Sequence, residues 1–196
     1  GSGFILTLTI LIMMFKDLVK IRYLILGVIL SGIGIVILIL TASYRLDRIT
    51  SYLNPWSDPL GTGFQSIQSL YAISPAGLFG HGLFKSHQKF YFLPEPQTDF
   101  IFAIIVEELG LIGGLIVIAS FTILIVIGYY GAMKCEDIFS KNILFGFTTL
   151  IFVQAFINMG VVTGLLPVTG VTLPFLSYGG SSLITTMAMM GIKARQ

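Results

Sequence analysis

Long apolar segments constrain the fold of this chain more than any other feature of its sequence. They cover residues 3–15, 23–42, 100–132, 143–166 and 180–192. An α-helix rises about 1.5 Å per residue, so about 20 apolar residues cross the roughly 30 Å hydrocarbon core of a bilayer. The middle three segments are long enough to do so, and the first and last are shorter. The sequence therefore predicts an all-α fold, a polytopic transmembrane helix bundle, with residues 1–196 in a single membrane domain.

The composition supports this class and excludes several others. Of 196 residues, 55% are apolar and only 10% are charged, whereas an ordinary soluble domain has roughly 25% charged residues. The formal net charge of +2 comes without a run of lysines or arginines, so nucleic acid is not an expected partner. The single cysteine, Cys135, excludes an internal disulfide framework and a cysteine-based zinc site.

Basic residues predict how the chain is oriented in the membrane. If the apolar segments cross alternately, seven basic residues fall on one side: Lys16, Lys20, Arg22, Lys134, Lys141, Lys193 and Arg195. The positive-inside rule assigns this side to the cytoplasm. The long segment 43–99 and the shorter segment 164–179 are therefore predicted to face outward, away from the cytoplasm.

The outward segment 43–99 combines turn residues with a short amphipathic pattern. Apolar residues recur at helical spacing with polar residues between them: Phe64, Ile67, Leu70 and Tyr71. This pattern predicts a short amphipathic helix that lies on the membrane surface or dips into it. The glycines of residues 77–82 have the wrong spacing for a dinucleotide fingerprint, and no predicted strand precedes them.

Asp99 stands where the outward segment enters the third apolar segment. Aspartate is a preferred N-cap residue, and a helix N-terminus favours a negative charge, so one interpretation of Asp99 is a helix cap. The other is a general base at the mouth of a cavity in the membrane. The two roles are compatible.

Two further carboxylates, Glu107 and Glu108, are predicted to lie two to three helical turns deeper in the membrane. Carboxylates at such depth are costly, so they should face protein or water and are candidates for a functional role. A packed polar pair that orders the bundle is the alternative. The nearby glycines at 110, 113 and 114 are interpreted as sites of close helix packing.

The outward side also carries a basic set and an irregular segment. Arg45, Arg48, Lys85 and Lys89 form the basic set, which is either ordinary surface or a phosphate-binding cluster. His81 and His87 lack a third ligand for a metal site. Prolines, glycines and hydroxyl residues fill positions 167–182, and such backbone is tolerated at membrane depth only where protein buries it or it lines a cavity. These residues alone do not distinguish an enzyme from a transporter.

Three stretches together resemble the SEDS family (shape, elongation, division and sporulation). They are YLNPWSDP at 52–59 with GFQxxQSL at 63–70, QKF at 88–90 through LPEPQTDFIFA at 93–103 with EELG at 107–110, and GLLPVTG at 164–170 through Ser182. The resemblance covers essentially the whole chain. SEDS proteins have about ten spans, so the chain is expected to be the C-terminal part of such a protein, with the first four or so absent.

The resemblance implies that the protein polymerises lipid II into peptidoglycan strands at the outer face of the bacterial plasma membrane. The family's catalytic aspartate, in its Thr-Asp-Phe motif, matches Asp99. Gln88, Lys89 and Thr172 are more similar to the FtsW and SpoVE branch, which acts in division or sporulation, than to RodA. Gln97 departs from the histidine that many members have. The implied partners are lipid II, membrane lipids and a class B penicillin-binding protein.

Several residues are expected to bind substrate in the implied reaction. Its pyrophosphate leaving group calls for Arg, Lys or a divalent cation, so a cation cofactor stays open and none is certain. Candidates for binding this group are Arg45, Arg48 and Lys89, whereas Glu95 and Glu108 are candidates to orient substrate or bind metal. The remaining expected substrate-binding residues are Thr98, Ser177 and Ser181.

Two other functions remain open at this point. A flippase or transporter of the lipid-linked precursor would depend on carboxylates near the bilayer midplane, which favours Glu107 and Glu108 over Asp99. A non-catalytic scaffold for a cell-wall transpeptidase would tolerate the loss of every carboxylate.

Overall fold

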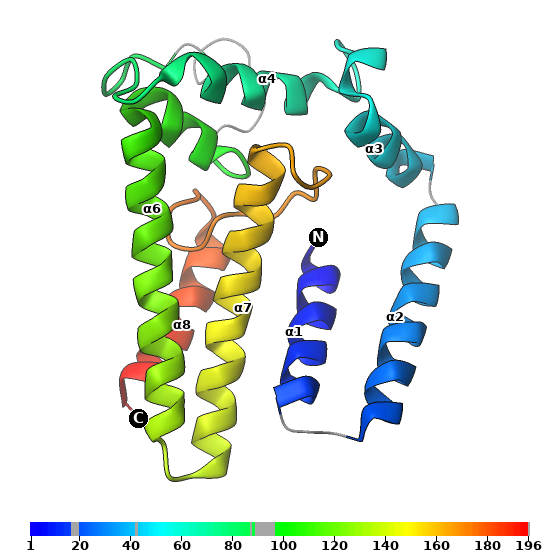
Figure 1. The fold of residues 1–196 in the computed structure, drawn as a ribbon, viewed down its shortest axis with the longest axis vertical. Helices are drawn as coiled ribbons and strands as arrows, with labels where there is room; N and C mark the ends of the chain where they lie inside the picture. Colours follow the sequence, from blue (N-terminus) through cyan, green and yellow to red (C-terminus); the bar gives the residue numbers. More distant parts are fainter. Residues whose placement is uncertain (17–19, 42, 87, 89–96, 196) are drawn as a thin grey trace.

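A computed structural model describes residues 1–16, 20–41, 43–86, 88 and 97–195 of the chain. Every regular element within these residues is a helix (Figure 1). The α-helices are α1 (Ser2–Lys16), α2 (Ile21–Leu40), α3 (Ser43–Leu53), α4 (Phe64–Ile73), α6 (Ile101–Lys134), α7 (Ile138–Val162) and α8 (Gly180–Arg195), and the short 3₁₀ helices are η1 (Pro55–Ser57) and η2 (Ser74–Ala76). Lys89 and Glu95 lie outside the described residues.

The helices form an upright bundle with a platform across one end. Figure 1 shows α6 and α7 side by side, α1 next to α7, and α2 farther out, while α4 lies across the upper ends of the upright helices. Among the described residues, α6 and α7 are long and apolar enough to cross a membrane, and three shorter apolar helices accompany them. The predicted all-α transmembrane bundle is confirmed.

The helix bounds follow the predicted apolar segments, with the largest shift at α7. This helix was predicted over 143–166 but begins at Ile138, because Asp137 caps it by accepting a hydrogen bond from the backbone N–H of Ser140 at 2.8 Å. That bond lowers the pKa of the Asp137 carboxyl below its ordinary value. The helix ends at Val162, just before Gly164, whose φ of 75° is a left-handed conformation that helices use to terminate.

The platform contains one predicted helix and one that was not predicted. The amphipathic helix expected around residues 64–71 is confirmed as α4, which buries Ile67, Ser69 and Ala72 and leaves Tyr71 exposed. Tyr71 forms an edge-on contact with Trp56, with ring centroids 6.0 Å apart. The unpredicted helix is α3, whose sequence alternates charged and apolar residues and lacks a long apolar run. Its position depends on tertiary contacts with the loop after α7.

The most unusual feature of the bundle is a break in α6 at Gly110. Gly110 has φ 72° and ψ −166°, a conformation that is essentially restricted to glycine. Figure 1 shows the result: a short upper part of α6 slants away from the long upright part and points toward the upper end of α7. The upright part, residues 111–134, is long enough to cross the membrane by itself.

A loop formed by residues 77–82 replaces the helical hydrogen bonds that the break removes. In a continuous helix, the carbonyls of Glu107 and Glu108 would accept hydrogen bonds from the N–H groups four residues later. Here they accept from His81 N at 3.0 Å and Gly82 N at 2.9 Å. The two N–H groups thus released, of Leu111 and Ile112, donate to the carbonyls of Gly77 at 3.0 Å and Leu78 at 3.3 Å. The loop therefore satisfies the backbone groups that a membrane helix cannot leave unpaired.

Two glycines permit this contact between the loop and the helix. A Cβ atom on Gly80 would lie 2.3 Å from the carbonyl oxygen of Glu108, and one on Gly110 would lie 2.3 Å from the carbonyl oxygen of Leu78. The interpretation of Gly110 as a helix-packing residue is therefore wrong, because it is the point at which the helix reverses.

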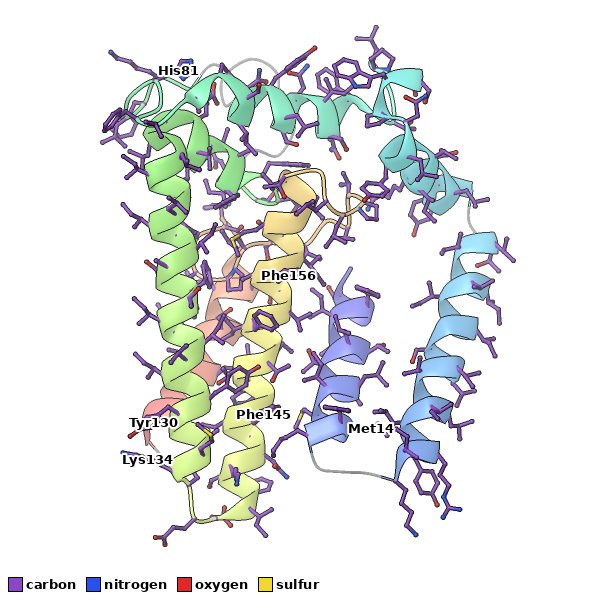
Figure 2. The ribbon with its side chains drawn as sticks, in the orientation of Figure 1. Met14, His81, Tyr130, Lys134, Phe145 and Phe156 are labelled. Atoms are coloured by element: carbon purple, nitrogen blue, oxygen red, sulfur yellow. The ribbon has the colours of Figure 1, made fainter. Side chains whose placement is uncertain are left out.

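The break also changes where the two adjacent glutamates lie. Glu107 and Glu108 were predicted two to three turns deeper in the membrane than Asp99, on the assumption of a continuous helix. Their carbonyls instead contact the 77–82 loop, and Figure 2 places His81 of this loop at the platform end of the molecule. The prediction of greater depth is wrong, because the first part of α6 runs back toward this end.

Candidate functional site

The candidate site is built on a turn, residues 97–100, that leads into α6. Three successive carbonyl oxygens of this turn accept hydrogen bonds from residues far along the chain. The carbonyl of Gln97 accepts from Tyr178 N at 2.8 Å, that of Thr98 from Ser177 Oγ at 2.5 Å, and that of Asp99 from Asn158 Nδ2 at 2.7 Å. The turn is therefore fixed by α7 and by the loop that precedes α8.

Asp99 is half-buried within this turn, and it does not cap the helix. The N-cap position of α6 is Phe100, and no side chain caps the helix there. The capping interpretation of Asp99 is wrong, because Phe100, only 1% exposed, is drawn into the core and shifts the start of the helix by one residue. The carboxylate instead lies beside Gly170, where a Cβ atom would be 3.6 Å from Asp99 Oδ2.

Gly170 belongs to an irregular segment, residues 168–172, that is held from three helices. Arg48 Nη1 of α3 donates to the carbonyl of Val168 at 3.0 Å, and Asn158 Nδ2 of α7 donates to that of Val171 at 2.6 Å. One turn earlier on α7, Gln154 Nε2 donates to the carbonyl of Thr172 at 3.0 Å. The hydroxyl of Thr172 pairs with that of Ser182 on α8 at 3.2 Å. The expectation that protein buries this irregular backbone is confirmed, since Val171 and Leu173 are both buried.

Two pockets are lined by residues of this site or of its neighbours. One, of about 380 Å³, is lined by residues of the turn and of the loop before α8, among them Gln97, Ile101, Ser177 and Tyr178. The other, also about 380 Å³, includes Arg48 and is bounded by α3, α4 and Val168.

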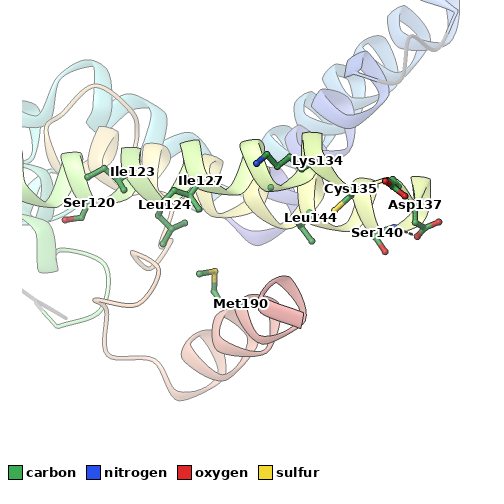
Figure 3. A pocket seen from close by; sticks show the side chains of 12 residues that line it. Ser120, Ile123, Leu124, Ile127, Lys134, Cys135, Asp137, Ser140, Leu144 and Met190 are labelled. Atoms are coloured by element: carbon green, nitrogen blue, oxygen red, sulfur yellow. Dashed lines mark hydrogen bonds between the residues drawn. The ribbon is translucent and has the colours of Figure 1, made fainter. Parts of the chain in front are cut away.

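A larger pocket, of about 930 Å³, lies at the opposite end of the bundle. Figure 3 shows it between α6, α7 and the Met190 side chain of α8, with Lys134 and Asp137 at its rim. Figure 2 shows Lys134 and Tyr130 at this end, and the Lys134 Nζ atom lies 4.5 Å from the Tyr130 ring centroid. Although this pocket is larger, it is not the candidate site, because its lining residues do not include the 97–100 turn.

The structure gathers some of the predicted substrate-binding residues and separates others. Arg48 contacts the 168–172 segment, and Thr98 and Ser177 are joined to each other. The Ser177 hydroxyl also accepts a hydrogen bond from Leu173 N at 2.7 Å, so its described contacts are with the backbone. Arg45 lies on α3, and Ser181 lies in the first turn of α8.

The two glutamates of α6 bond to residues of the 77–88 region and are not part of the 97–100 turn. Glu107 is 3% exposed, and its carboxylate accepts hydrogen bonds from Ser86 Oγ at 2.6 Å and Gln88 N at 3.3 Å. Glu108 is 8% exposed, and within the described part of the chain its Oε1 atom has no hydrogen-bond partner. In the part of the chain that the structure describes, no three His, Cys, Asp or Glu residues gather as metal ligands.

The sequence analysis missed Asn158 and Gln154, which hold the site from α7. Both are amides in the predicted apolar segment 143–166, and such polar residues are rare enough in membrane helices to be candidates for function. That signal was available in the sequence. It did not show which residues they contact.

Comparisons with known proteins show which family this chain resembles. Residues 1–195 match the family model FTSW_RODA_SPOVE, described as "Cell cycle protein". Stage V sporulation protein E of Bacillus subtilis is 51% identical over 192 residues, covering 98% of this chain and 52% of that protein. The probable peptidoglycan glycosyltransferase FtsW of Geobacter metallireducens is 46% identical, covering 98% of this chain and 51% of that protein. The chain thus spans about half the length of these relatives.

Two solved structures are also similar. One, described as "Structural coordination of polymerization and crosslinking by a peptidoglycan synthase complex", is 30% identical with a TM-score of 0.73, covering 98% of this chain and 54% of that one. The other, a mutant of the Thermus thermophilus rod shape determining protein RodA, is 32% identical with a TM-score of 0.50, covering 65% and 40%. With a family match over nearly its whole length and a relative that shares half of its residues, this chain belongs to the FtsW/RodA/SpoVE family.

Proposed function

We propose that the full-length protein polymerises lipid II into peptidoglycan strands at the outer face of the plasma membrane, during division or sporulation, with Asp99 as the general base. The observation that carries the proposal is the fixation of the 97–100 turn, which holds a half-buried carboxylate against the 168–172 segment. A base must be held in position to contribute to catalysis, and three hydrogen bonds to successive carbonyls hold this one. Relatives named as probable peptidoglycan glycosyltransferases support the activity.

In the proposed reaction, two lipid-linked disaccharides are joined. The 4-hydroxyl oxygen of the acceptor sugar forms a bond to the anomeric carbon of the donor, and the bond from that carbon to undecaprenyl pyrophosphate breaks. The proton of the hydroxyl passes to the carboxylate of Asp99. A neutral hydroxyl is a weak nucleophile, and a positioned base accelerates such a step by about 10² to 10⁴-fold.

The leaving pyrophosphate gains negative charge and needs a cationic partner. Arg48 belongs to the proposed basic set. Its hydrogen bond to the carbonyl of Val168 links it to the segment beside Asp99. Guanidinium groups stabilise developing phosphate charge well. Arg45, Lys89 and a divalent cation remain further candidates for this role.

The location of the glutamates argues against a transporter. A flippase was expected to use carboxylates near the bilayer midplane. Glu107 and Glu108 instead contact the loop at the platform end through their backbone, and the Glu107 carboxylate is bonded to Ser86 and Gln88.

The proposed topology can be tested by cysteine labelling in a full-length protein without its native cysteines. Leu60 lies in a turn of the platform and is 89% exposed, so Leu60→Cys is expected to react with an impermeant maleimide in intact cells. Glu136→Cys, exposed between α6 and α7, is expected to react only after the membrane is permeabilised. Labelling at position 136 but not at position 60 in intact cells would reverse the orientation.

The proposed partner is a class B penicillin-binding protein, which would couple strand synthesis to crosslinking. A structural relative belongs to a peptidoglycan synthase complex that coordinates these two processes. Exposed apolar side chains along α6, including Leu115, Ile116 and Ile123, offer a surface on which a single membrane helix can pack. The full-length protein is expected to co-purify with such a transpeptidase from native membranes. Its absence after crosslinking would contradict the proposal.

A further inference from the structure

We propose that Asn158 is a positioning residue that sets the Asp99 carboxylate relative to the 168–172 segment. The inference rests on the proposed function, because it assigns to Asn158 a role in the reaction of Asp99. Asn158 lies on α7, four residues before the helix ends at Val162, and is only 1% exposed.

The amide of Asn158 acts only as a donor. Its Nδ2 group carries two hydrogens and donates to two carbonyls, those of Asp99 at 2.7 Å and Val171 at 2.6 Å. Its Oδ1 atom is buried and has no hydrogen-bond partner among the residues that the structure describes. Reversing the amide would point that oxygen at two carbonyl oxygens, so the chemistry of its neighbours fixes its orientation.

The two hydrogen bonds link the residue that carries the carboxylate to the segment against which the carboxylate lies. One bond holds the backbone of Asp99 itself. The other holds Val171, the residue after Gly170, and Gly170 is the residue beside which Asp99 Oδ2 lies. A single NH₂ group therefore fixes both the residue that carries the base and the surface that the base faces.

Neighbouring side chains hold the site at other points, and although Ser177 links Thr98 of the turn to Leu173, the residue after the segment, its printed bonds do not include Asp99. Gln154 holds the 168–172 segment at Thr172, and Ser177 holds the turn at Thr98. Asn158 is the residue, among those described, whose side chain bonds to Asp99 and to that segment together. Loss of its two donors should let the carboxylate shift against the substrate while the other contacts keep the fold.

The test uses the full-length protein with its transpeptidase partner and lipid II. Asn158→Leu has a similar volume but no donors. We expect it to lower kcat about 10- to 100-fold, because small displacements of a catalytic group have effects of this size. The KM for lipid II should change by less than about threefold, since a base acts mainly in the transition state.

A matched control separates positioning from general destabilisation. Thr149 is fully buried on the same helix, and its hydroxyl pairs with Tyr129 at 3.0 Å, away from the 97–100 turn. Thr149→Val destabilises the protein by removing a buried hydrogen bond at nearly constant volume, but it should leave kcat within about twofold of wild type. An equal loss of kcat in Thr149→Val would overturn the inference, as would a wild-type kcat in Asn158→Leu.

A second readout tests whether Asn158 acts through Asp99. In an Asp99→Asn background, Asn158→Leu should change the remaining rate by less than about threefold, because residues that act as a unit are not additive. A further 10-fold loss there would assign Asn158 a purely structural role and overturn the inference. If Asn158→Leu does not accumulate, the smaller Asn158→Ser replaces it under the same criteria. Failure of the proposed function is distinguishable, since it would appear as wild-type polymerisation by Asp99→Asn alone.

Discussion

Asp99→Asn is expected to lower the rate of lipid II polymerisation by at least about 100-fold while the amount of protein in the membrane stays unchanged. The substitution keeps the size of the side chain and removes the base, which is worth about 10² to 10⁴-fold in such reactions. The bond from Asn158 goes to the backbone carbonyl of residue 99, so it survives the change. The measurement is glycan strand formation by purified full-length protein with its transpeptidase partner and lipid II.

Asp58→Asn is a suitable control for this prediction. Asp58 is an exposed carboxylate of the platform, and it accepts hydrogen bonds within its own turn, from Gly61 N at 3.1 Å and Thr62 N at 2.9 Å. We expect polymerisation close to wild type. A near wild-type rate in Asp99→Asn would contradict the catalytic assignment, and the scaffold alternative would then regain support. Impaired movement of the precursor in Asp99→Asn, with a separate polymerase supplied, would support the flippase.

Gly110→Ala is expected to destabilise the protein by at least about 3 kcal/mol and to reduce its accumulation in the membrane. The backbone conformation at this position is strained for any residue with a Cβ atom, and the added atom would lie 2.3 Å from the Leu78 carbonyl oxygen. Relief of this clash requires separation of α6 from the 77–82 loop, which would break four backbone hydrogen bonds. Thermal unfolding in detergent and the amount of protein in membranes are the measurements.

Gly131→Ala provides the control on the same helix. A Cβ atom there would make an ordinary contact with Leu144 Cδ2 at 3.5 Å, and the backbone at this position is helical. Alanine also has a higher helix propensity than glycine, so stability should be unchanged or slightly higher. A Gly110→Ala protein as stable as Gly131→Ala would contradict the role of the break.

The sequence by itself determined the class of the protein and the approximate positions of the helices, and it singled out Asp99 as the candidate catalytic residue. Apolar runs and the amphipathic pattern of α4 are local properties, because a helix repeats every 3.6 residues and each side chain faces lipid, protein or water accordingly. The resemblance to the SEDS family rests on short local motifs, and the comparisons confirm it. The roles expected of the individual site residues remain predictions.

Only the tertiary structure decided where α6 breaks and how Asp99 is held. The sequence shows glycines at 80 and 110, but the break depends on a loop whose backbone replaces the missing helical hydrogen bonds. The bonds from Asn158 to Asp99 and from Ser177 to Thr98 join residues 59 and 79 positions apart. No local pattern encodes such pairs, because they form only when the packing of α6 against α7 brings the two chain segments together.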